Sequence, residues 1–167
     1  LRKERGLSQA RLAELLDIDA VSAPYHRGGN YFYTRRHRGL QKPIYYMRRG
    51  DDGPEEVLLD PNKLSPDGSV AVHGIFPSFD GKLVAYKLSR NNADASTLYL
   101  RDLETGRDRP DVIDGARYAA PSWTPDGRGF YYVWLPTDDS IPPSELPGRA
   151  EVRYHRVGEP ASRDSIV

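Results

Sequence analysis

Twelve serines, four histidines and 24 acidic side chains are the residues that could carry out nucleophilic or acid–base chemistry in this 167-residue chain. A serine hydrolase needs its nucleophile on a sharp Gly-x-Ser-x-Gly turn, together with a histidine base and an orienting acid. No serine has that context. Ser78 and Ser122 each lie just upstream of an Asp-Gly dipeptide, and this recurrence indicates a structural role at a hairpin. The sequence therefore assigns no catalytic residue to this chain.

The four histidines are scattered along the chain, at His26, His37, His73 and His155. Zinc sites need closely spaced ligands, and the sequence has no His-x-x-x-His pair and no carboxylate at ligand spacing. We expect most of these histidines at exposed strand or loop positions. The chain also lacks a Gly-rich phosphate loop and an EF-hand loop, so we predict neither a metal nor a cofactor.

The composition favours a globular protein with many short strands. Hydrophobic residues make up 38% of the chain, and tyrosine, with 11 residues, dominates the aromatics; tyrosine favours a pleated, half-buried surface. Cysteine is absent, which excludes a disulfide framework and favours a reducing or redox-indifferent compartment. No apolar run approaches the roughly 18 residues that a membrane span needs. We therefore expect a cytoplasmic protein without a membrane partner.

Charge is unevenly distributed, although the net charge is zero. Residues 1–50 hold 11 Lys/Arg against 4 Asp/Glu, and the remainder holds 13 against 20. Residues 1–16 resemble the opening of a phage-repressor-type helix-turn-helix, so an N-terminal DNA-binding segment is one alternative function. However, Asp17, Asp19 and Pro24 stand where the recognition helix belongs. We therefore expect no nucleic-acid partner.

Repeated strand patterns are the most informative feature of the sequence. Apolar pairs recur at steps of 54 residues, in Ile44/Tyr46, Leu98/Leu100 and Val152/Tyr154. A second set recurs at the same step, in Leu59, Ile113 and Val167. Asp-Gly dipeptides, which signal hairpin turns, precede two of the strand runs. Four short antiparallel strands in a unit of about 40–50 residues are typical of a β-propeller blade.

The sequence predicts an all-β fold, namely a partial, open β-propeller of about three four-stranded blades with a short N-terminal helix. We expect residues 1–20 to form a helical segment that leads into the propeller, since Leu12, Leu15 and Leu16 share one helical face. Residues 21–167 then form the blade repeats. A β-sandwich also uses short strands, but it gives no reason for the 54-residue step. Three blades cannot close a ring, so we expect a fragment of a longer polypeptide.

Five stretches resemble the entry into the propeller of prolyl oligopeptidases: Arg11–Asp17, Arg27–Tyr33, Val57–Asn62, Pro121–Tyr132 and Val152–His155. This resemblance implies a serine peptidase that hydrolyses short proline-containing peptides beneath a seven-bladed, substrate-gating propeller. It also implies that an α/β-hydrolase catalytic domain of the same polypeptide, absent from this chain, is the main partner and holds the Ser-Asp-His triad. The triad therefore cannot be mapped onto any residue present here.

The same resemblance identifies Tyr118 as a substrate-binding residue. In the family, an aromatic residue just after the fourth strand of the second unit faces the hydrolase domain and lines the outer subsite of the substrate. Tyr118 occupies the matching position. The alternative for this residue is an ordinary tyrosine on an inner strand. The alternative for the whole chain is a non-enzymatic propeller that serves as an interaction module, because propellers have many unrelated functions.

Overall fold

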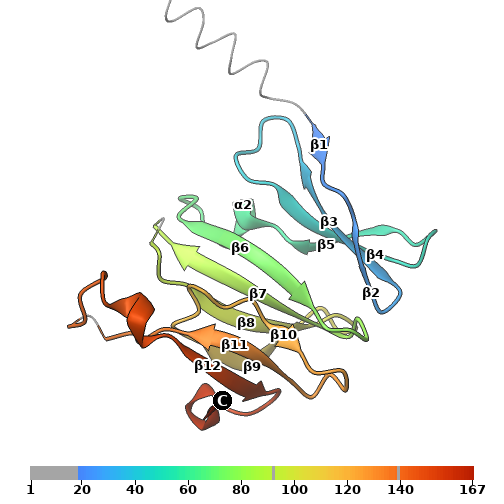
Figure 1. The fold of residues 1–167 in the computed structure, drawn as a ribbon. Helices are drawn as coiled ribbons and strands as arrows, with labels where there is room; N and C mark the ends of the chain where they lie inside the picture. The colour runs from blue at the N-terminus through green and yellow to red at the C-terminus, as the bar shows by residue number, and fades with distance from the viewer. Residues whose placement is uncertain (1–18, 92, 139) are drawn as a thin grey trace, which may run out of the picture. The chain divides into compact units, whose positions relative to one another are not determined.

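The computed structural model describes residues 19–91, 93–138 and 140–167. Figure 1 shows strands that form three antiparallel sheets. Residues 1–18 of the expected helical segment, and with them the helix-turn-helix alternative, lie outside the described residues. The chain forms two compact units, one that contains residues 30–66 and another that contains residues 67–167, and each unit is described by itself.

The first unit contains one sheet around the long strand β3 (Asn30–Arg36). β3 pairs with β4 (Ile44–Arg49), which in turn pairs with β5 (Glu55–Leu59). Two short strands, β1 (Ala20–Val21) and β2 (Tyr25–Arg27), both pair with β3. Because β4 occupies one edge of β3, β1 and β2 lie along its other edge and together take the place of one strand.

Alternation along the strands decides which side chains of the first sheet are buried. Phe32 on β3 and Met47 on β4 are in register and are 2% and 3% exposed. Successive side chains of a strand point to opposite faces, so Tyr31, Tyr33 and Arg35 lie together on the other face of β3. This second face is partly exposed.

A four-residue helix, α2 (Pro61–Leu64), follows β5, although the sequence patterns predicted no further helix. Asp60 caps it, because its side chain accepts a hydrogen bond of 3.0 Å from the backbone N–H of Asn62. Pro61 stands in the first turn, where a backbone N–H has no helical acceptor. The sequence Leu59-Asp60-Pro61-Asn62 is thus a local signal for the start of a helix.

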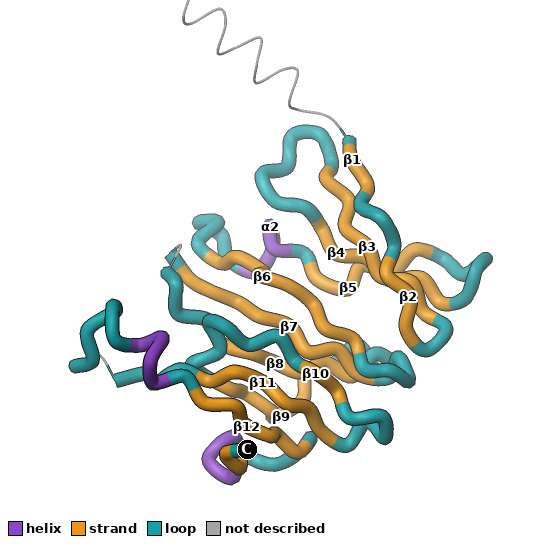
Figure 2. Tube along the Cα trace, viewed as in Figure 1, coloured by secondary structure: helices purple, strands orange, loops and turns teal. Residues whose placement is uncertain are grey.

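The second unit contains two four-stranded antiparallel sheets whose strands follow the order of the chain. One holds β6 (Val70–Pro77), β7 (Leu83–Arg90), β8 (Thr97–Asp102) and β9 (Asp108–Ile113). The other holds β10 (Ser122–Trp123), β11 (Gly129–Trp134), β12 (Glu151–Arg156) and β13 (Ser165–Ile166). Two short 3₁₀ helices, η1 (Leu146–Arg149) and η2 (Ala161–Arg163), lie before and after β12, and Figure 2 draws them in purple.

The predicted blade repeat is confirmed. The apolar pairs spaced 54 residues apart lie on β4, β8 and β12, the third strand of each sheet. Leu59 and Ile113 end the fourth strands β5 and β9, and Val167 directly follows β13. A β-sandwich would place the strands in two sheets, whereas the described strands form three.

The two sheets of the second unit share one hydrophobic core. Leu98, Leu100 and Ile113 of the first of these sheets pack in a cluster with Phe130 and Tyr132 of the other, and all are at most 2% exposed. A further link is polar, because the Trp123 indole N–H donates a 2.8 Å hydrogen bond to the carbonyl of Phe76 across the two sheets. Apolar burial and this hydrogen bond therefore hold consecutive blades together.

The turn between β6 and β7 is stabilised by side chains that bond the local backbone. The Ser78 hydroxyl donates to Asp80 Oδ1 at 2.6 Å and accepts a 3.0 Å hydrogen bond from the backbone N–H of Leu83. Gly81 follows with φ of 68°, a left-handed conformation that glycine adopts without strain. Ser78 thus has the structural role that its place before Asp-Gly predicted.

Thr124, rather than Ser122, takes the equivalent place in the turn between β10 and β11. Its hydroxyl donates to Asp126 Oδ1 at 2.6 Å and accepts a 3.2 Å hydrogen bond from the backbone N–H of Gly129. Ser122 is exposed on β10. The prediction that Ser122 has the same role as Ser78 is therefore wrong, because the hydroxyl two residues later takes that role.

Replacing Ser78 with alanine is expected to lower the free energy of unfolding by about 1–3 kcal/mol, because the N–H of Leu83 loses its hydroxyl acceptor at a part-buried position. Ser122→Ala, at an exposed position, is the matched control and should change it by less than about 0.5 kcal/mol. Both values are measured by urea unfolding of the intact protein. Equal effects of the two substitutions would contradict the assigned role of Ser78.

Candidate functional site

Tyr118 lies in a tight turn between β9 and β10 and is 42% exposed. Its backbone belongs to no strand. The alternative of an ordinary inner-strand tyrosine is therefore wrong. The Tyr118 side chain is accessible to solvent. Accessible aromatic rings on anchored turns are suited to binding, because they offer apolar contact area with a polar tip.

Small buried residues and backbone hydrogen bonds anchor the Tyr118 turn. Ala116 and Ala119 on either side of it are fully buried, and the N–H of Ala119 donates to the carbonyl of Ala116 at 3.0 Å. The N–H of Ala116 donates to the carbonyl of Ser96 at 2.9 Å, and Lys87 Nζ donates to the carbonyl of Arg117 at 3.1 Å. The turn is thus fixed at both ends.

Gly115 joins this turn to the long loop that follows β11. Its carbonyl accepts a 2.9 Å hydrogen bond from the N–H of Leu135. The φ of Gly115 is 73°, and a Cβ at this position would lie 2.2 Å from the carbonyl oxygen of Leu135. Only glycine fits such a close approach of two backbones, so Gly115 sets how near the loop comes to Tyr118.

Arg117 places a positive charge beside the exposed ring. Its guanidinium carbon lies 5.3 Å from the centroid of the Tyr118 ring, a cation–π distance. Arg117 Nη2 also lies 2.8 Å from Asp94 Oδ2. An exposed ion pair of this kind stabilises a fold little, and its main effect here is to orient the guanidinium at the edge of the turn.

A pocket of about 330 Å³ opens next to Arg117. Three loops line it, one from β7 to β8, one from β9 to β10 and one from β11 to β12. Its apolar wall consists of Leu135, Pro136, Ile141, Pro143 and Leu146. A concave apolar wall with a few charged groups at its edge is typical of sites that bind ligands or peptides. We call Tyr118, Arg117 and this pocket the rim site.

The rim site offers charged groups from Arg117, Asp94 and Asp138. No histidine is among the described residues that line its pocket. Within residues 19–91, 93–138 and 140–167, no group of three or more His, Asp or Glu side chains could hold a metal ion. Over those same ranges, no helix is long and apolar enough to cross a membrane.

His155 on β12 corrects the expectation that the histidines are exposed, since its exposed fraction is 0%. Its Nδ1 lies 2.8 Å from Asp164 Oδ1, and its Nε2 lies 3.1 Å from Asp111 Oδ1 on β9. Asp164 also accepts a 2.6 Å hydrogen bond from the Tyr132 hydroxyl. Because both ring nitrogens are taken by carboxylates, His155 has no free nitrogen to act as a general base.

The electrostatics of this cluster fit a charged imidazolium between two carboxylates. Burial acts to lower the pKa of His155, but its hydrogen bonds to Asp111 and Asp164 outweigh that effect and raise the pKa to about 9. Burial likewise opposes ionisation of Asp111, yet hydrogen bonds from His155 and the Gly158 N–H lower its pKa. The cluster ties the two sheets of the second unit together.

Comparison with known proteins identifies what the chain is similar to. Residues 1–167 match the family described as prolyl oligopeptidase, N-terminal β-propeller domain. A prolyl endopeptidase of Elizabethkingia miricola is 28% identical over 98% of this chain and 23% of the relative. A prolyl oligopeptidase of Dendrothele bispora is 32% identical over 86% of this chain and 22% of the relative. The chain thus spans about a quarter of the length of these relatives.

Solved structures agree with the sequence comparison. A prolyl endopeptidase studied for inter-domain dynamics in catalysis and specificity is 46% identical, with a TM-score of 0.92 over 97% of this chain and 24% of that one. Prolyl oligopeptidase B of Galerina marginata, bound to a 35mer hydrolysis and macrocyclization substrate, is 25% identical, with a TM-score of 0.77 over 98% of this chain and 27% of that one.

Proposed function

Because the chain belongs to the prolyl oligopeptidase family, whose N-terminal propeller domain it matches throughout, we propose that it gates substrate access to a serine peptidase site elsewhere in the same polypeptide. Residues 21–167 supply the first three blades of a seven-bladed ring, and residues 1–20 lead into them. The observation that carries this proposal is that the described strands form antiparallel sheets that follow one another along the chain. The chain covers only 23% of the related prolyl endopeptidase of Elizabethkingia miricola.

The reaction proposed for the intact protein is hydrolysis of short proline-containing peptides. The catalytic α/β-hydrolase domain supplies the triad for nucleophilic acyl transfer, and the propeller excludes large substrates. The test compares cleavage of a short proline-containing peptide with cleavage of a folded protein that exposes prolines. Cleavage of the peptide alone is expected. Equal cleavage of both would argue against gating, and no cleavage of either would favour a non-enzymatic interaction module.

A cytoplasmic location is a further part of the proposal. The absence of cysteine is compatible with a reducing compartment, where disulfides are rare. Fractionation of the source cells tests it, with recovery of the protein in the cytoplasmic fraction as the expected result. Recovery in a secreted fraction would overturn it.

Within this function we assign Tyr118 to the outer part of the peptide-binding site. Its ring is accessible on an anchored turn, and the apolar pocket of the rim site lies beside the neighbouring Arg117. A peptide residue that packs on the ring would remove apolar surface from water. The contact is assigned to binding, because the proposed triad belongs to the catalytic domain and not to this chain.

Replacing Tyr118 with alanine in the intact protein is expected to raise KM about tenfold, which corresponds to about 1.4 kcal/mol of binding, and to leave kcat nearly unchanged. Tyr118→Phe should retain most of the affinity, since it keeps the ring. Phe79→Ala is the matched control, because Phe79 is 50% exposed at the opposite end of the same sheet, in the turn after β6. An unchanged KM in Tyr118→Ala would remove Tyr118 from the site.

A further inference from the structure

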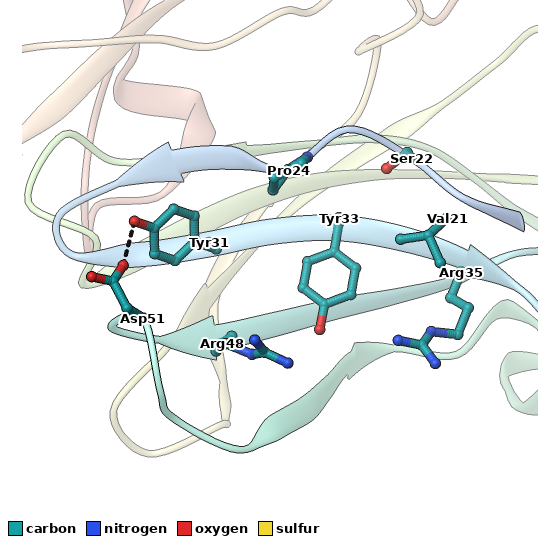
Figure 3. A pocket seen from close by; sticks show the side chains of 8 residues that line it. All are labelled: Val21, Ser22, Pro24, Tyr31, Tyr33, Arg35, Arg48 and Asp51. Atoms are coloured by element: carbon teal, nitrogen blue, oxygen red, sulfur yellow. Dashed lines mark hydrogen bonds between the residues drawn. The ribbon is translucent and has the colours of Figure 1, made fainter.

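A charged side chain on the flat face of a blade loses water wherever another sheet covers that face. On the first sheet, Arg35 and Arg48 line such a face, which Figure 3 shows. In the ring proposed above, a neighbouring blade covers that face. Lys87 on β7 differs from these arginines, because both sheets that enclose it belong to this chain.

Alternation places Lys87 on the apolar face of β7. Ala85, two residues earlier, belongs to the core cluster between the two sheets of the second unit, and side chains two residues apart on a strand share a face. Across the strand pair, Lys87 stands opposite Leu98, which is fully buried in the same cluster. A lysine therefore occupies a position for which the strand pattern predicts an apolar residue.

Among the described residues, the ammonium group of Lys87 has one hydrogen-bond partner. Its Nζ donates a 3.1 Å hydrogen bond to the carbonyl of Arg117, the residue before Tyr118. In the part of the chain that the structure describes, no carboxylate pairs with this ammonium group, and burial lowers its pKa. One carbonyl therefore has to compensate for the water that the charge loses on folding.

The hydrogen bond from Lys87 acts on the turn that carries Tyr118. Backbone hydrogen bonds close this turn at Ala116 and Ala119, and the carbonyl of Arg117 lies between them in the chain. A peptide unit is planar, so a fixed carbonyl at Arg117 fixes the plane that ends at the Cα of Tyr118. The direction in which the ring projects depends on that plane.

We propose that Lys87 is a positioning residue for Tyr118, an inference that rests on the peptide-binding role proposed above. The ammonium group holds the peptide unit before Tyr118, so the ring keeps one direction before a peptide arrives. The half-buried charge lowers the stability of the second unit, because an apolar side chain of similar volume would avoid the desolvation. Lys87 thus lowers stability while it orders the rim site.

Lys87→Met in the intact protein is the test, because methionine keeps most of the volume but has neither charge nor donor. KM for a short proline-containing peptide is expected to rise about fivefold with kcat nearly unchanged, since a displaced ring keeps part of its contact. The melting temperature should stay the same or rise. A residue with a merely structural role would instead lower the melting temperature when it is replaced.

Two further variants serve as controls. Lys87→Arg should keep most of the affinity, because a guanidinium also donates to a carbonyl. Lys82→Met is the matched control, since Lys82 is exposed in the turn between β6 and β7, and it should change neither KM nor the melting temperature. Equal rises of KM in Lys87→Met and Lys82→Met would contradict the proposal.

A double-mutant cycle shows whether Lys87 acts through Tyr118. In a Tyr118→Ala protein, Lys87→Met should leave KM unchanged, because the ring to be positioned is gone. A further rise of KM in that protein would overturn the proposal, and so would an unchanged KM in Lys87→Met when Tyr118→Ala raises it. If Tyr118→Ala leaves KM unchanged, or if no peptide is cleaved, the function proposed above fails, and hydrogen exchange decides the inference.

Hydrogen exchange of the intact protein needs no activity. In Lys87→Met the amide of Ala119 should exchange faster, because its hydrogen bond to the carbonyl of Ala116 closes the same turn, whereas the amides of β7 and β8 should keep their protection. Equal protection of the Ala119 amide in the wild type and the variant would remove the positioning role from Lys87, whether or not the protein cleaves peptides.

Discussion

His155→Ala is expected to lower the stability of the second unit by about 3–5 kcal/mol, the range found when one partner of a buried ion pair is removed. The imidazole is fully buried between Asp111 and Asp164. Alanine would leave both carboxylates without their shared cation and would also leave a cavity. Asp111 would keep Arg109, whose Nε lies 3.6 Å from Asp111 Oδ2, and the N–H of Gly158 as partners, but it would lose its fully buried cation.

Hydrogen exchange of the amides in β9 and β12 of the intact protein is the suitable measurement, because it reports the local opening free energy even when several domains unfold separately. His73→Ala is the matched control. His73 is exposed on β6 and bonds Ser89 Oγ at 2.6 Å, so its loss should cost less than about 1.5 kcal/mol. A His155→Ala protein with unchanged protection in β9 and β12 would contradict the role given to the cluster.

Stability of the second unit is expected to fall on the alkaline side of neutrality by about 3 kcal/mol. The pKa of His155 is raised from 6.5 to about 9 in the folded protein. Between these values the folded state holds a proton that the unfolded state has released. The contribution of His155 is therefore complete below pH 6.5 and is lost as the pH rises through about 9.

On the acid side of neutrality, the change of stability with pH has the opposite sign. The pKa of Asp111 is lowered from 3.8, so its contribution is present above pH 3.8 and is lost as the pH falls through the folded value.

Hydrogen exchange corrected for intrinsic rates, measured from pH 6 to pH 10 for the wild type and His155→Gln, isolates the alkaline effect. The decline should be present in the wild type and absent in the variant. The same slope in both proteins would assign the decline to other groups.

Local sequence patterns were sufficient to predict the strands and their grouping into blades. Period-two alternation and Asp-Gly turns act over a few residues, and the 54-residue step then relates β4, β8 and β12 to one another. The α2 helix was missed because its signal is a single capped turn, in which Asp60 and Pro61 act without helical periodicity. The role expected of Ser122 belongs to Thr124, because the shape of the turn decides which position supplies the hydroxyl, and a threonine hydroxyl bonds the turn as well as a serine hydroxyl does.

The rim site could be predicted only in part. The resemblance to a family singled out Tyr118, but its turn, its exposure and the neighbouring pocket depend on three loops from different strands. Gly115 gave no usable signal in the sequence, since its need for glycine arises from the carbonyl of Leu135, 20 residues further along the chain.

The sequence by itself determined the all-β class, the four-strand repeat and the turns, because backbone conformation responds to neighbours that are close in the chain. The tertiary structure alone decided which charged groups are buried and with what partners. Asp111 and His155 are 44 residues apart and belong to different sheets, and Arg48 lacks a carboxylate because Glu55 bonds Arg35 and Tyr33 instead. Coulomb interactions and desolvation depend on distance through space, and only the packed sheets set those distances.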